Sequence, residues 1–104
     1  MEFYYNKLIR DNIPYIIEES GNKCEFEIVS DEIALLYLYS KLTEEMNEFF
    51  SSKNLEEIVD IIEVLYSLCD KMGYSREELE EIRKSKLKKN GGFDKNYILK
   101  KVWK

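Results

Sequence analysis

The chain has 104 residues, of which 44% are apolar, 13% are aromatic and 36% are charged, and its net charge is −5. This length fits one domain over residues 1–104, and the acidic balance argues against a general nucleic-acid binder. The sequence contains no histidine, which excludes Ser-His-Asp and Cys-His nucleophiles and removes the usual nitrogen ligand of zinc. Any enzymatic chemistry therefore depends on carboxylates, lysine, arginine, tyrosine or a metal ion.

The first residues of the chain lack the basic flank and the apolar stretch of a secretory signal. No segment approaches the roughly 20 apolar residues of a membrane span. We therefore expect a cytoplasmic protein with no membrane partner, in which Cys24 and Cys69 are free thiols.

The first predicted element is a short helix from about Ile13 to Ser20. Asp11 can cap its start, Pro14 is tolerated in its first turn, and Gly21 can end it. Residues 24–29 alternate loosely between polar and apolar side chains, which predicts a short extended segment or edge strand.

A long helix is predicted from Asp31 to Ser52. At about 100° per residue, its apolar side chains share one face. These residues are Leu35, Leu38, Leu42, Met46 and Phe49. Only a short connection precedes the next helix, so the two helices should be antiparallel neighbours.

Two capping-box patterns predict the remaining helices. Asn54 with Glu57 opens a helix that runs to about Met72, where Gly73 supplies the stop. Ser75 with Glu78 opens a helix over about Arg76–Lys89. The apolar side chains of residues 93–103 are expected to pack back onto the body, which completes an all-α antiparallel helical bundle.

Two pairs of carboxylates stand at helical spacing near the predicted hairpin. Glu45 with Glu48, and Glu57 with Asp60, are each three residues apart, so each pair points to one side of its helix. Antiparallel packing places both pairs at the same end of the hairpin. Converging carboxylates repel one another without a counterion, and their hard oxygen atoms suit one or two Mg²⁺ ions.

The spacing alone leaves a solvated acidic face open as an alternative. Glutamate is abundant in the chain, and the stretch Glu77–Glu81 repeats part of the same pattern without a partner pair on a neighbouring helix. Glu57 also has a second explanation as a member of a capping box.

Three stretches of the chain resemble one protein superfamily. The motifs Glu44-Glu45-Met46-Asn47-Glu48 and Glu57-Ile58-Val59-Asp60 resemble the signature of the all-α nucleoside triphosphate pyrophosphatases, which include MazG-like and phosphoribosyl-ATP pyrophosphohydrolase-like proteins. The opening Tyr5–Pro14 and the ending Lys88–Phe93 resemble those of the small MazG-like subgroup. The resemblance extends over nearly the whole chain.

The resemblance implies Mg²⁺-dependent hydrolysis of a nucleotide to its monophosphate and pyrophosphate. The metal ligands would be the four acids of the two pairs, and Glu44 or Glu63 would orient or deprotonate the attacking water. Hydrolysis of phosphoribosyl-ATP in histidine synthesis, or nucleotide and metal binding without catalysis, are the alternatives. Because so small a fold has little room for a deep pocket, a second subunit could supply a wall, and we expect a homodimer or homotetramer.

Basic and glycine residues are candidates for binding the phosphates of the nucleotide. Backbone N–H groups at a Gly-Gly pair can approach an anion, and cationic side chains can neutralise it. For a single lysine, an interaction with a helix end is the competing explanation, and the glycines can simply end a helix. The candidates are Lys7, Arg10, Arg83, Lys86, Gly91 and Gly92, with Lys95 as a further cation.

Overall fold

A computed structural model describes residues 1–104 and contains four helices and no strand. The helices are α1 (Ile13–Glu19), α2 (Asp31–Ser52), α3 (Leu55–Lys71) and α4 (Arg76–Asn90). The prediction of an all-α chain is therefore confirmed, and the helices begin and end close to the predicted residues.

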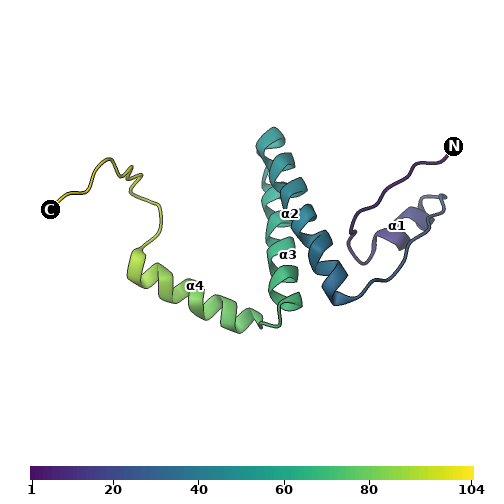
Figure 1. Cartoon of the computed structure of the whole chain (residues 1–104). Helices are drawn as coiled ribbons and strands as arrows, with labels where there is room; N and C mark the ends of the chain where they lie inside the picture. The colour runs from purple at the N-terminus through teal and green to yellow at the C-terminus, as the bar shows by residue number, and fades with distance from the viewer.

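The helices α2 and α3 lie side by side as a hairpin at the centre of the molecule (Figure 1). Lys53 ends α2 in the left-handed conformation, with a φ of 54°. The side chain of Asn54 then caps α3 by accepting a hydrogen bond of 3.1 Å from the backbone N–H of Glu57. At the opposite end of the hairpin, Lys71 Nζ lies 2.8 Å from Asp31 Oδ1. These contacts show that the two helices are antiparallel, as predicted.

The hydrophobic core of the single chain is small. Ala34, Leu38 and Val64 are its only buried apolar residues, and they lie where α2 faces α3. The radius of gyration is 18.5 Å, whereas a compact chain of this length would have a value of about 13 Å. The isolated chain is therefore an open structure with a packed hairpin at its centre.

The helix α4 leaves the end of α3 and carries the chain away from the hairpin (Figure 1). Its start is capped as predicted, because the Ser75 hydroxyl accepts a hydrogen bond from the Glu78 N–H at 3.1 Å. The prediction that residues 93–103 pack back onto the body is wrong for this structure, because α4 directs them outward. Phe93 and Trp103 are accordingly 97% and 74% exposed.

Two local predictions near the N-terminus differ from the structure. Of the two alternatives for residues 24–29, a short extended segment or an edge strand, the edge strand is absent, because no neighbouring strand offers them backbone hydrogen bonds. Asp11 does not cap α1, since the N-cap is Asn12 and its side chain makes no capping hydrogen bond. The helix instead begins from a turn in which the Ile13 N–H donates to the Arg10 carbonyl at 3.0 Å.

None of the four helices combines the length and the apolar character that a membrane crossing needs. Cys24 and Cys69 form no disulfide bond, and each is partly buried against backbone carbonyls.

Candidate metal centre

Three carboxylates converge between the two helices of the hairpin. Glu45 comes from α2, while Glu57 and Asp60 come from the first two turns of α3. One oxygen atom of each lies within 4.8 Å of one oxygen of the other two. The antiparallel hairpin thus brings together three of the four predicted metal ligands, which we refer to as the acidic cluster.

Glu45 is the only buried charged residue of the chain, with 6% of its surface exposed. Its Oε1 atom lies 3.4 Å from Lys41 Nζ, whereas its Oε2 atom is buried and has no hydrogen-bond partner. Glu57 Oε2 is buried and unpartnered in the same way. A buried carboxylate oxygen without a partner is destabilising, and a hard cation such as Mg²⁺ would satisfy both oxygens. The donor set therefore fits a divalent cation.

The electrostatics of the cluster act most strongly on Glu45. Its burial raises the pKa of the Glu45 carboxyl, the negative charge of Glu48 raises it further, and Asp60 adds a smaller effect in the same direction. The nearby Lys41 ammonium opposes these effects in part. Either a bound proton or an added cation would therefore offset the unfavourable buried charge of the Glu45 carboxylate.

The other predicted acids lie around the cluster. Glu48 is exposed and outside the group of three, although its charge reaches Glu45. Glu44 lies between two lysines, 3.7 Å from Lys7 Nζ and 3.5 Å from Lys41 Nζ. Glu63 is half-buried, lies one helical turn after Asp60 on α3, and forms no ion pair.

Residues 6–10 form a strap that lies against the hairpin and carries two of the predicted cations. The Tyr37 hydroxyl donates a hydrogen bond of 3.1 Å to Asn6 Oδ1, and Lys7 pairs with Glu44. Arg10 Nη2 donates to Asp60 Oδ1 at 2.9 Å. The N-terminal strap therefore brings Lys7 and Arg10 to the edge of the acidic cluster.

The remaining predicted phosphate contacts are not brought to the cluster. Arg83 and Lys86 lie on α4, which leads away from the hairpin, and Gly91 and Gly92 follow its end (Figure 1). Arg83 Nη2 pairs with Glu80 Oε1 of its own helix at 2.6 Å. These four residues therefore lie on α4 or directly after it, on the part of the chain that leads away from the acidic cluster.

Sequence reasoning missed Lys41, which joins Glu44 and Glu45 by two ion pairs. The signal was present, because the spacings of three and four residues place all three side chains on one side of a helix. Lys41 also lines a cavity of about 280 Å³ beside the cluster. The cavity is formed by the N-terminal strap and α2, through Asn6, Lys7, Leu8, Tyr37, Ser40, Lys41 and Glu44.

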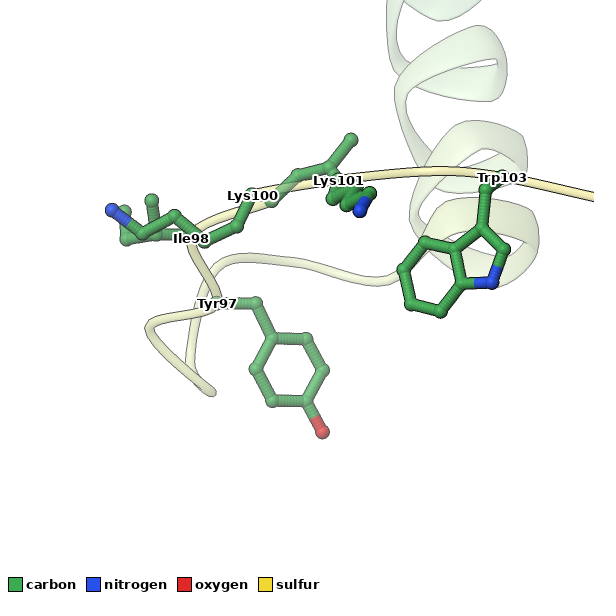
Figure 2. A pocket seen from close by; sticks show the side chains of 6 residues that line it. Tyr97, Ile98, Lys100, Lys101 and Trp103 are labelled. Atoms are coloured by element: carbon green, nitrogen blue, oxygen red, sulfur yellow. The ribbon is translucent and has the colours of Figure 1, made fainter.

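A larger hollow lies in the C-terminal tail, where Tyr97, Ile98, Lys100, Lys101 and Trp103 surround it (Figure 2). All of its lining comes from one short stretch, and Tyr97 and Trp103 are 82% and 74% exposed. We therefore place the candidate site at the acidic cluster, where buried polar atoms lack partners, and not at this hollow.

Comparison of the chain with protein-family models, with curated proteins and with solved structures gives no match.

Proposed function

We propose that the chain is a Mg²⁺-dependent hydrolase that cleaves a nucleoside triphosphate, or a related nucleotide, to its monophosphate and pyrophosphate. The observation that carries this proposal is the pair of buried, unpartnered oxygens of Glu45 and Glu57 within a converging group of three carboxylates. A solvated acidic face would turn such oxygens towards water. The motif resemblance supplies the reaction class, and the geometry supports the cation that this class requires.

In this proposal Glu45, Glu57 and Asp60 hold the cation, and Glu48 at the exposed edge completes the ligand set. A bound Mg²⁺ would neutralise phosphate oxygens and lower the pKa of a coordinated water. Glu63 is the better candidate to orient the attacking water, because Glu44 is already held by two lysines.

The substrate would enter from the side of the N-terminal strap. Lys7, Arg10 and Lys41 all lie at this edge of the cluster, and their charges complement the phosphates of a nucleotide. The cavity between the strap and α2 is slightly smaller than the usual small-molecule pocket. A single chain therefore provides cationic side chains that can bind the phosphates, but its cavity is too small to enclose the base and the sugar of a nucleotide.

A second copy of the chain would supply the missing wall. Along α3, Leu55, Ile58, Ile62 and Leu65 recur at spacings of three, four and three residues and stay 39–72% exposed. Met72, the residue that caps the end of α3, follows seven residues after Leu65 and is 57% exposed. On α2, a matching exposed series is formed by Leu36, Tyr39, Met46 and Phe50. Such spacing is typical of helices that pack against a partner helix. We include a homodimer, or a homotetramer built from it, in the proposal.

The test is a Mg²⁺-dependent assay of pyrophosphate release from a panel of nucleoside triphosphates and phosphoribosyl-ATP. Asp60→Asn and Glu48→Gln should abolish or greatly reduce turnover while the variants keep their helical circular dichroism. Glu81→Gln on α4, which lies outside the cluster, is the matched control and should keep full activity. Activity that persists in both Asp60→Asn and Glu48→Gln would contradict the proposal.

The same experiment separates the alternatives. Turnover confined to phosphoribosyl-ATP would assign the chain to that reaction. Thermal stabilisation by a nucleotide with Mg²⁺, but no turnover of any substrate, would indicate a binding module without catalysis.

A further inference from the structure

We infer that Arg10 is a built-in counter-cation of the acidic cluster, which exchanges its contact with Asp60 for the anionic ligand when a divalent cation binds. This inference rests on the proposed function, because it concerns how the same site is loaded. It assigns to the N-terminal strap a role in the order of binding: the cation first, and a phosphate-bearing anion second.

The contacts of Arg10 support this role. Its guanidinium makes one hydrogen bond, to Asp60 Oδ1 at 2.9 Å, and its side chain is 53% exposed. Arg10 is therefore held by a single carboxylate at the mouth of the cluster and not by a surrounding network. An exposed pair of this kind contributes little stability, so it can be broken and replaced by other contacts at small cost.

The charge balance of the cluster favours the exchange. The three carboxylates of the cluster and the neighbouring Glu48 carry four negative charges, and the two nearest cations are Lys41 and Arg10, which leaves a formal charge of −2. Arg10 reaches only Asp60, whereas the unpartnered Oε2 atoms of Glu45 and Glu57 are buried. A divalent cation between the three carboxylates would satisfy the oxygens that a guanidinium at the edge leaves without a partner.

The attachment of the strap to α2 determines where the Arg10 side chain lies after its contact with Asp60 is broken. The strap stays attached to α2 through the Tyr37–Asn6 hydrogen bond and the Lys7–Glu44 pair. Both contacts are independent of Asp60, so a released Arg10 side chain remains beside the cluster. Its planar guanidinium then meets two phosphate oxygens of an incoming ligand, the geometry in which arginine binds anions most strongly.

The test compares Arg10→Met with Lys7→Met, which removes the same charge from the same strap but leaves Asp60 untouched. Binding of Mn²⁺ alone is measured by electron paramagnetic resonance, and binding of inorganic pyrophosphate is measured by calorimetry in saturating Mn²⁺. Arg10→Met should bind Mn²⁺ about two- to fivefold more tightly than the wild type, because the competing ion pair is gone. It should bind pyrophosphate about tenfold more weakly. Lys7→Met should leave the Mn²⁺ affinity within about twofold.

In Arg10→Met, tighter binding of Mn²⁺ together with weaker binding of pyrophosphate distinguishes this inference from a loss of structure, because a loss of structure would weaken the binding of both ligands. In the wild type, Mg²⁺ should also shift the ¹⁵N signal of the Arg10 guanidinium and leave that of Arg83 in place. Unchanged or weaker Mn²⁺ binding by Arg10→Met, while the wild type binds Mn²⁺, would overturn the exchange and leave the proposed function standing. Failure of every protein to bind Mn²⁺ would overturn both.

Discussion

Replacing Glu45 by glutamine should stabilise the metal-free protein, although it damages the proposed site. The carboxylate of Glu45 lies within 4.8 Å of those of Glu57 and Asp60 and 3.4 Å from the Lys41 ammonium. At an effective dielectric constant of about 20, each repulsion amounts to about 3.5 kcal/mol and the attraction to about 5 kcal/mol. The balance is about 2 kcal/mol against the charged form, and both the burial of Glu45 and the charge of Glu48 add to it.

Arg10 offsets part of the charge of Asp60, so we expect about 1 kcal/mol of the calculated balance to appear as added stability. For a domain of this size, that corresponds to a rise in Tm of about 4–8 °C. The assay is thermal unfolding followed by circular dichroism in buffer with EDTA. Glu81→Gln, which removes one exposed acid on α4, is the control and should change stability by less than about 0.5 kcal/mol.

The pH dependence of the folding stability provides a second test of the Glu45→Gln variant. Because the pKa of Glu45 is raised above its ordinary value of 4.5, the folded protein binds more protons than the unfolded chain between these two pKa values. This residue therefore makes wild-type stability fall as pH rises from about 4.5 through the raised pKa, and Glu45→Gln removes that contribution. A Glu45→Gln variant that is less stable than the wild type by more than about 1 kcal/mol in EDTA would show that the charged Glu45 carboxylate does not destabilise the metal-free fold.

Three further predictions concern the proposed metal site, the end of α2 and the exposed face of α3. Saturating Mg²⁺, at about 100 times its Kd, should stabilise the wild type by about 2.7 kcal/mol; thermal unfolding with and without Mg²⁺ measures this, and an equal gain in Asp60→Asn would contradict the cluster as its site. Lys53→Gly should stabilise the fold by roughly 0.5–1 kcal/mol in urea unfolding, because Lys53 has a positive φ of 54°; the control Gly73→Ala, at a φ of 90°, should destabilise by a similar amount. Ile62→Glu should lower the mass measured by light scattering to that of the monomer, whereas Ile28→Glu, in the connection before α2, should not; an unchanged mass for Ile62→Glu would exclude the α3 face from the interface.

The helices were predictable because their signals are local. Ser30, Asn54 and Ser75 each accept a hydrogen bond from the backbone N–H three residues later, and these capping patterns can be read directly from the residue types. The short connection between α2 and α3 then determines their antiparallel packing. The approach of Glu45 to Glu57 and Asp60 follows from this packing, which is why spacing alone could predict it.

The arrangement outside the hairpin could not be predicted in the same way. The outward direction of α4 depends on the turn at Gly73 and Tyr74, and apolar content alone led to the expectation that residues 93–103 pack inward. The contact of Arg10 with Asp60 joins residues 50 positions apart, and no local pattern encodes such a pair. Helical spacing alone wrongly placed Glu48 among the converging carboxylates. Glu48 lies one turn from Glu45 on the same side of α2, but it is exposed and does not belong to the acidic cluster.

If the acidic cluster binds a divalent cation, crystals grown with Mn²⁺ should show the bound ion by anomalous diffraction. We expect an anomalous peak between the carboxylates of Glu45, Glu57 and Asp60 in the wild type, and no peak there in Asp60→Asn. Saturating Mn²⁺ with no peak among these three side chains in the wild type would contradict cation binding by the acidic cluster.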